Sequence, residues 1–216
     1  MILLGYALSI GYIVLAFLIT WLCKKLFSIQ EETSRKLIHI SISFMWPIMY
    51  YTLKGTIHFF AIPLAVFILF FAVSKTKLFS IITREKGDSL FGIMLYIISI
   101  VIMSLISFFL PDTLVAYGLA VFALTFGDGF AALFGKRFGK YTPKLFGDKS
   151  LAGSLACIVF AFIGMTLVSL LIGYPINIPK FLLLSFATAI LEIYSGKWDN
   201  LSIPLTIMTL GYFLNV

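Results

Sequence analysis

Long apolar runs follow one another along nearly the whole chain, and they restrict it to very few folds. They cover residues 2–23, 37–53, 57–74, 89–110, 113–134, 151–173, 178–195 and 201–215. The hydrocarbon core of a bilayer is about 30 Å thick, so a helix needs about 20 apolar residues to cross it. The last run is short and the second is marginal. We therefore predict a membrane protein with seven or eight spans, built as one domain over residues 1–216.

Each span is expected to be an α-helix. Backbone groups in lipid must be satisfied within the segment, and the alternating pattern of a membrane β-barrel is absent. Of the residues, 61% are hydrophobic and 12% are charged, against about half and about a quarter in soluble domains. A soluble helical protein would also need polar helix faces, which most of these runs lack. The predicted class is an all-α transmembrane helical bundle.

The basic residues predict the orientation of this bundle. All lysine and arginine residues except Lys54 and Lys180 fall in alternate connections, which lie on one side of the membrane. The positive-inside rule makes that side cytoplasmic, and with eight spans it places both termini outside. This bias also accounts for the formal net charge of +7. The positive charge should attract anionic membrane lipids. No basic run has the aromatic residues interleaved with cations that a nucleic-acid platform needs, so no nucleic acid is expected as a partner.

Two carboxylates lie within the predicted spans. Asp128 is about six residues from the inner end of the fifth run, and Glu192 is about four residues from the inner end of the seventh. A carboxylate at mid-helix costs about 2.5–3.5 kcal/mol to insert, and somewhat less near the interface. Such residues usually face the bundle interior or a wet cavity and mark functional sites. The alternative is a structural ion pair or an interhelical hydrogen bond.

Small residues share one helical face with Asp128. Ala131, Ala132 and Gly135 follow it at spacings that keep them on that face. Small side chains let another helix approach closely, but they also let a ligand approach the backbone. Cations just beyond this face favour an anionic ligand. The cations are Lys136, Arg137 and Lys140, and Gly139 lies between the last two.

The sixth run begins with residues that suit phosphate. Ser150 is a typical N-cap residue, so free N–H groups and the positive end of the helix dipole would face the cytoplasm. Lys149 adds a cation before the cap, and Ser154 lies one turn later. Gly147 and Gly153 permit close approach to the backbone. The alternative is an ordinary capped helix beside a lysine of the cytoplasmic side.

Two acids and an amide converge on the turn between the last two runs. Glu192 precedes this turn, and Asp199 and Asn200 follow it. Oxygen ligands of this kind suit Mg²⁺, which one or two carboxylates hold together with substrate phosphates. The alternative is plain turn chemistry, since Asp and Asn are common turn residues.

The second run opens with Arg35, Lys36 and His39. Arg35 and His39 are four positions apart and share a helical face. A histidine just inside the membrane could contact phosphate or accept a proton. A structural histidine at the interface is the alternative.

Together these motifs resemble the CTP-dependent lipid kinases, a family that includes dolichol kinase, phytol kinase and a CTP-using diacylglycerol kinase. Phosphatidate cytidylyltransferases are more distantly similar. The resemblance covers about Ser34 to Leu205, although this chain has Ala152 where the family often carries an acid. It also lacks the late basic-acidic run and His-Gly-Gly of the cytidylyltransferases. The residues that carry the resemblance are Asp128, Ala131, Gly135 and Gly139, then Lys149, Ser150, Gly153 and Ser154, with Arg35, Lys36, His39, Glu192, Asp199, Asn200, Leu201 and Pro204.

The resemblance implies a Mg²⁺-dependent kinase that transfers the γ-phosphoryl of CTP to a lipid alcohol taken from the bilayer. The alcohol would be a dolichol-like polyprenol, phytol or geranylgeraniol, or diacylglycerol, and the small size of the chain favours an isoprenoid. Asp128, Glu192 and Asp199 would hold Mg²⁺, or one of them would accept the proton of the alcohol. The catalytic residues would be Asp128, Lys149, Glu192 and Asp199. The residues that contact nucleotide or phosphate would be Arg35, Lys36, His39, Gly135, Lys136, Arg137, Gly139, Lys140, Lys149, Ser150, Gly153, Ser154 and Asn200.

Two other functions stay open on the sequence. A CTP-dependent phosphatidate cytidylyltransferase would make a CDP-lipid and release pyrophosphate. A small ion-coupled transporter would use Asp128 and Glu192 as ion or proton sites, but transporters often show internal repeats and helices broken at mid-membrane. Here the polar residues gather toward one face, and no convincing repeat is found. The chain is also compatible with a homo-oligomer.

Overall fold

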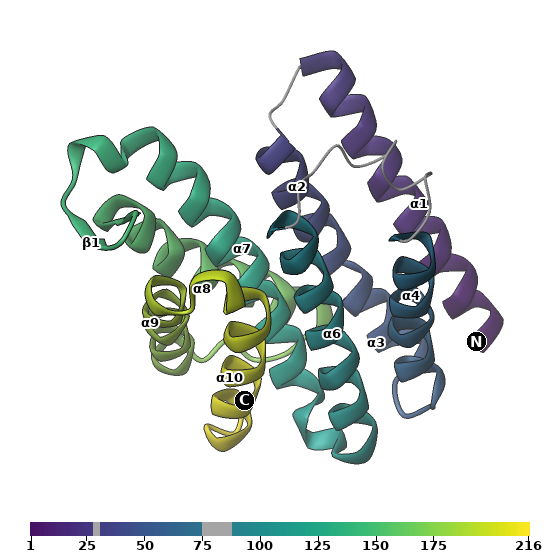
Figure 1. Cartoon of the computed structure of the whole chain (residues 1–216). Helices are drawn as coiled ribbons and strands as arrows, with labels where there is room; N and C mark the ends of the chain where they lie inside the picture. Colours follow the sequence, from purple (N-terminus) through teal and green to yellow (C-terminus); the bar gives the residue numbers. More distant parts are fainter. Residues whose placement is uncertain (28–30, 75–87) are drawn as a thin grey trace.

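The helical prediction is confirmed by the computed structural model, which describes residues 1–27, 31–74 and 88–216 (Figure 1). The segment 75–87, with four cations of the predicted cytoplasmic side, lies outside these ranges. The helices of the described part are α1 (Ile2–Phe27), α2 (Glu31–Ser43), α3 (Met45–Leu53), α4 (His58–Ser74), α6 (Asp88–Phe109), α7 (Leu114–Phe138), α8 (Leu151–Ile172), α9 (Ile178–Tyr194) and α10 (Asp199–Phe213).

The predicted runs correspond to these helices, except that the second run divides in two. Pro47 stands in the first turn of α3. Its ring lacks an N–H group and clashes with the carbonyl of the residue four positions earlier, which is Ser43, the last residue of α2. The Ser43 side chain also bonds back into α2, where its hydroxyl donates to the carbonyl of Ile40 at 2.6 Å. The helix is therefore interrupted at Phe44.

The lengths of the helices support a membrane protein. In the described part, four helices are long and apolar enough to cross a bilayer, and a shorter apolar helix covers His58–Ala72. α9 and α10 are also short for a span, with 17 and 15 residues. Large apolar side chains such as Leu155 and Val159 of α8 are exposed on the outside of the bundle, as expected where lipid covers a surface. The chain is a helical membrane protein, and the number of seven or eight spans stays a prediction.

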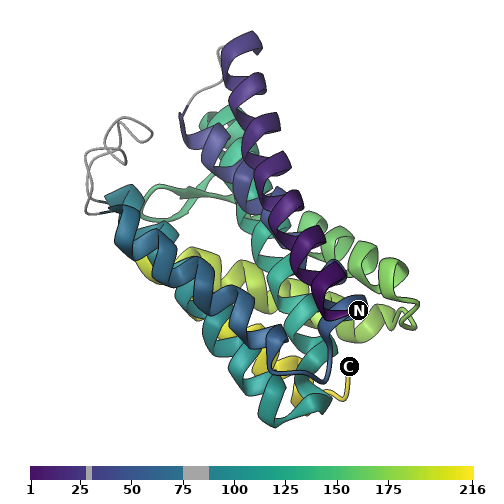
Figure 2. The same cartoon turned by 90° about the vertical axis from the view of Figure 1, so that its right-hand side faces the viewer.

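α7 is the central helix of the bundle. It packs against α2, α8, α9 and α10, and most of its residues are buried. α1 lies at the periphery, at the right of Figure 1 and toward the viewer in Figure 2, and it packs mainly on α2 and α3. Residues of α7 are therefore the ones best shielded from lipid on all sides.

Small residues bring α7 and α8 together along their length. A Cβ on Gly164 would lie 2.7 Å from the carbonyl oxygen of Phe122, and one on Gly127 would lie 3.2 Å from the Cys157 sulfur. A Cβ on Gly153 would lie 3.1 Å from the Ala131 carbonyl oxygen. Of these contacts, the one between Gly153 and Ala131 involves the small-residue face, which fits its structural alternative of close helix packing, and contact of that face with a ligand stays a prediction.

A short hairpin at one end departs from the all-α prediction. β1 (Lys144–Phe146) pairs antiparallel with β2 (Lys149–Ser150). Gly147 lies in the turn with φ of 56°, a conformation that favours glycine. Its role is thus in the turn, and nothing lies within 4 Å of a Cβ added there. This end of the bundle, at the upper left of Figure 1, is called the hairpin end below.

Candidate active site at the hairpin end

A buried ion pair joins α2 to α7. The ammonium of Lys36 donates to Oδ2 of Asp128, and the two residues are 8% and 5% exposed. A buried charge is tolerated only with a good partner, because taking it out of water costs several kcal/mol. The Asp128 carboxylate lies within the bundle, as predicted, but its partner is a residue that the sequence had assigned to phosphate.

A second pair joins the hairpin to α9. The ammonium of Lys149 in β2 donates to Oε1 of Glu192, which is 4% exposed. Burial disfavours the charged form of Lys149, but the hydrogen bond and charge of Glu192 outweigh it and raise the lysine pKa. The charges of Asp128 and Asp199 act in the same direction. The two pairs thus belong to one electrostatic group.

The third predicted acid joins this group from the start of α10. Oδ1 of Asp199 accepts from the backbone N–H of Asn200 at 2.7 Å. Burial, and then the charge of Asp128, raise the pKa of Asp199 to about 6, although Lys36 and Lys149 act against this. We call Lys36, Asp128, Lys149, Glu192 and Asp199 the charge cluster. It gathers residues from α2, α7, β2, α9 and α10.

The donor set of the cluster suits Mg²⁺. Its carboxylates are oxygen ligands. The pKa of Asp199 is raised first by burial and then by repulsion from Asp128, and a cation would relieve that repulsion. In the part of the chain that the structure describes, no group of three or more His, Cys, Asp or Glu side chains is close enough to hold a metal ion. The lysines hold Asp128 and Glu192 instead. A metal site at Asp128, Glu192 and Asp199 therefore stays a prediction, and it requires these carboxylates to leave their lysines.

Two polar side chains near the cluster are buried and incompletely bonded. Asn200 is 8% exposed, and its Nδ2 donates to the carbonyl of Gly92 at 3.1 Å, across the contact of α10 with α6. Among the described residues, Oδ1 of Asn200 and Oγ of Ser154 have no hydrogen-bond partner. A buried acceptor without a partner costs about 1–3 kcal/mol. Both atoms are thus candidates for ligand contact.

The start of α8 both confirms and corrects the sequence prediction. Ser150 is the N-cap, and its Oγ accepts from the N–H of Gly153 at 3.3 Å. The N–H of Leu151 donates to the Pro143 carbonyl at 2.9 Å, and that of Ala152 donates to Thr142 Oγ1 at 3.3 Å. The N–H groups expected to be free for phosphate are therefore already bonded within the protein. Phosphate binding at this point stays a prediction, and it would depend on side chains such as Lys149.

The glycines of the motif make room for this cap. A Cβ on Gly139 would lie 2.8 Å from the Ser150 hydroxyl oxygen, and one on Gly135 would lie 3.5 Å from it. Gly153 also lies close to Gly135, because a Cβ added to Gly153 would lie 3.4 Å from the Gly135 Cα. Their observed role is in packing, and contact with a nucleotide stays a prediction.

The cations beyond Asp128 lie outside the cluster. Lys136, Arg137 and Lys140 are exposed at the end of α7. The Arg137 guanidinium lies over the Phe138 ring at 5.5 Å, and the Lys140 ammonium over the Tyr141 ring at 4.7 Å. Their exposure would let them attract an anion to this end, and their contact with a nucleotide stays a prediction. The side chain of Arg35 lies outside the described residues.

His39 is buried and stacks on Tyr96 of α6, with ring centroids 4.5 Å apart and an angle of 16° between the planes. Tyr96 was not singled out from the sequence, and no signal could have found it. A tyrosine inside an apolar span has the same pattern as any core aromatic residue.

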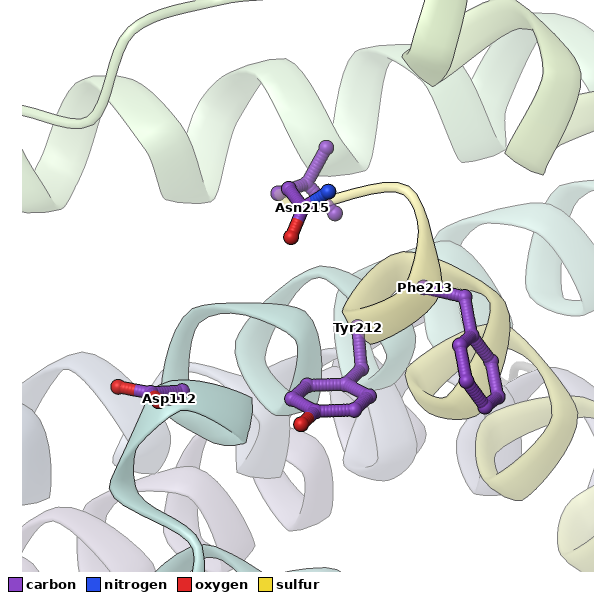
Figure 3. Close-up of a pocket in the computed structure, with 5 residues that line it drawn as sticks. Asp112, Tyr212, Phe213 and Asn215 are labelled. Carbon is purple, nitrogen blue, oxygen red and sulfur yellow. The ribbon is translucent and has the colours of Figure 1, made fainter.

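A surface hollow lies far from the cluster. It is lined by Asp112 and by the end of α10 with Tyr212, Phe213 and Asn215 (Figure 3). Asp112 precedes Asp128 by 16 residues, or about 24 Å along a helix. The hollow therefore has no part in the chemistry of the charge cluster.

The fold and the charge cluster define a helical membrane protein with a polar site at one end of its bundle. The chain belongs to the cytidylyltransferase family, whose family model matches residues 1–196. It is 30% identical over 207 residues to a probable phytol kinase 1, chloroplastic, of Glycine max, with 86% of this chain and 68% of the relative covered. It is 28% identical over 189 residues to a phytol kinase of Synechocystis, with 81% of this chain and 76% of the relative covered. These matches confirm the resemblance to the CTP-dependent lipid kinases. No solved structure matches the chain.

Proposed function

We propose that this chain is a Mg²⁺-dependent membrane kinase that transfers the γ-phosphoryl of CTP to an isoprenoid alcohol of the phytol kind. The observation that carries the proposal is the charge cluster, in which the buried Lys36 and the half-buried Lys149 hold two buried carboxylates at one end of the bundle. The similarity to phytol kinases supports the choice of acceptor. The basic residues at the same end support a site on the cytoplasmic face.

The ion pairs support a change of partner when the nucleotide binds. Lys36 and Lys149 are cations already inside the protein, and a triphosphate offers them more negative charge than Asp128 and Glu192 do. Phosphoryl transfer depends mainly on positioning and on charge stabilisation. In this scheme the lysines bind phosphate oxygens and so free the two carboxylates. Mg²⁺ held by Asp128, Glu192 and Asp199 would neutralise the phosphate charge.

The transfer itself requires few groups. The alcohol oxygen attacks the γ-phosphorus, the bond from that phosphorus to the bridging oxygen breaks, and CDP leaves with the electron pair. The alcohol proton goes to a carboxylate of the charge cluster. The site lies beside apolar helices that face lipid, so the isoprenoid chain can stay in the bilayer while its hydroxyl reaches the site.

The alternative within the family is transfer of a cytidylyl group to phosphatidate, which the name of the matching family favours. The two reactions differ in their products, CDP for the kinase and pyrophosphate for the cytidylyltransferase. Purified protein in detergent would be given Mg²⁺, γ-labelled CTP and phytol, geranylgeraniol, dolichol or diacylglycerol in separate samples. Label in the lipid together with CDP supports the kinase and identifies the alcohol.

The control variants use two aspartates at opposite ends of the bundle. Asp128→Asn should abolish transfer, whereas Asp112→Asn, at the hollow of Figure 3, should leave it unchanged. Pyrophosphate release with phosphatidate, and no label in any lipid, would assign the alternative. Folded protein that is silent in both assays would refute both functions.

A further inference from the structure

Tyr96 carries a buried hydroxyl that no other described residue binds. The residue is 2% exposed, and among the described residues its hydroxyl has no hydrogen-bond partner. Buried hydroxyls of tyrosine usually find a partner, and an unsatisfied one costs about 1–3 kcal/mol. A phenylalanine would fill the same space without that cost. The hydroxyl is therefore explained best by a partner that is not part of the chain.

The position of Tyr96 connects it to the charge cluster. Its ring stacks on His39, which lies three residues after Lys36 on α2 and therefore one turn further into the bundle. Tyr96 thus lies about one helical turn from the Lys36–Asp128 pair, and the stack on His39 orients its ring.

A second buried atom without a partner among the described residues lies on α10, which packs against α6. Asn200 binds the Gly92 carbonyl through Nδ2, which leaves Oδ1 as its free end. Gly92 and Tyr96 are four residues apart on α6, so they share a face and are separated by about 6 Å along the axis. The described structure therefore has a free tyrosine hydroxyl and a free amide oxygen on facing helices.

The chemistry of these two atoms selects the ligand. The Asn200 oxygen only accepts hydrogen bonds, whereas the Tyr96 hydroxyl can donate one. A phosphate oxygen would be repelled by the amide oxygen, since both are acceptors. Before transfer, an alcohol can accept from Tyr96 and donate to Asn200 with its single hydroxyl group. Its proton would leave Asn200 for a carboxylate of the charge cluster as the oxygen attacks. The carbon chain of such an alcohol would extend into the apolar region beside α6.

We propose that Tyr96 and Asn200 form the subsite that binds the hydroxyl of the acceptor alcohol, with His39 holding the Tyr96 ring in place. This inference rests on the proposed function, because it assumes that an alcohol is the acceptor. It assigns α6 to the alcohol and leaves β2 and the end of α7 to the nucleotide.

The test compares phytol with phytane, a hydrocarbon of the same branched skeleton that has no hydroxyl. Each would be added at equal mole fraction to detergent-purified wild-type protein, Tyr96→Phe and Tyr117→Phe, and thermal stabilisation would be measured. Tyr117 is the matched control, a buried tyrosine whose hydroxyl donates to the Ile100 carbonyl at 3.4 Å. Wild type and Tyr117→Phe should bind phytol more tightly than phytane, by about three- to tenfold for each of the two hydrogen bonds. In Tyr96→Phe this preference should fall about three- to tenfold, because only the hydrogen bond to Asn200 remains.

Two further measurements decide the matter. Without ligand, Tyr96→Phe should be as stable as wild type or more so, and a loss of stability would overturn the proposal, because the hydroxyl would then have a structural partner. In turnover, Tyr96→Phe should raise the KM for phytol about three- to tenfold and leave the KM for CTP unchanged. Equal changes in both KM values, or none in either, would also overturn it. Since binding is measured without turnover, a wild type that binds phytol but transfers no phosphoryl group would refute the proposed function separately.

Discussion

Lys36 of α2 and Asp128 of α7 are 92 positions apart in the chain, and they form a buried ion pair at the hairpin end of the bundle. The pair explains how a carboxylate is tolerated inside a membrane protein in the absence of ligand. It also places a cation where a triphosphate could take it over. Removing one partner should therefore lower both stability and activity, whereas removing both charges should restore stability without restoring activity.

Lys36→Met should destabilise the protein strongly, because it leaves Asp128 as an uncompensated buried charge, a change of about 3–5 kcal/mol. The double variant Lys36→Met with Asp128→Asn should recover most of that loss, since no charge then remains. Neither variant should transfer phosphoryl groups. Thermal unfolding in detergent measures the first effect and labelled CTP the second. A double variant as unstable as Lys36→Met would contradict this account of the pair.

Lys149→Met should reduce kcat/KM for CTP by about 10²–10³-fold, the loss typical of one charged donor to a transition state. Its matched control is Lys144→Met in the same hairpin, whose ammonium pairs with Asp148 at 3.5 Å while both side chains are largely exposed. Exposed pairs contribute little, so Lys144→Met should behave as wild type. Equal losses in both variants would mean that the hairpin acts only through its overall charge.

Gly139→Ala should act through Ser150 rather than through the nucleotide. The new Cβ would lie 2.8 Å from the Ser150 hydroxyl oxygen, so the cap of α8 must shift, with a loss of about 1 kcal/mol. Ser150→Ala removes the same cap, and combining the two variants should cost less than their sum. Gly11→Ala in α1 is the control, with nothing within 4 Å of its Cβ. A Gly139→Ala protein of normal stability but raised KM for CTP would instead favour direct nucleotide contact.

Removal of Mg²⁺ with a chelator should abolish transfer, and Asp199→Asn should raise the Mg²⁺ concentration needed for half-maximal activity. We expect a shift of at least about tenfold, the loss of one charged ligand from a site with two or three. The KM for phytol should not change. Asp148→Asn, an exposed acid of the hairpin turn, is the control. The Asp199 assignment fails if both variants need the same Mg²⁺ concentration as wild type.

Much of this protein could be predicted from local sequence. The apolar runs predicted the helices because a bilayer requires long apolar segments with internal hydrogen bonds. Ser150 was recognised as an N-cap because capping depends on a few neighbouring residues. Asp128 and Glu192 drew attention because a carboxylate inside an apolar span is costly wherever the span lies.

Tertiary structure decided how these residues combine. The pairing of Asp128 with Lys36 and of Glu192 with Lys149 depends on which helices lie side by side, and no spacing in the chain encodes it. Packing also brought Thr142 and Pro143 to the first N–H groups of α8, so that groups expected to bind phosphate were already satisfied. Tyr96 acquired its significance only when stacking on His39 and the surrounding helices enclosed its hydroxyl. Local sequence determines what each segment can form, whereas the burial and the partners of a polar atom depend on residues distant in the chain.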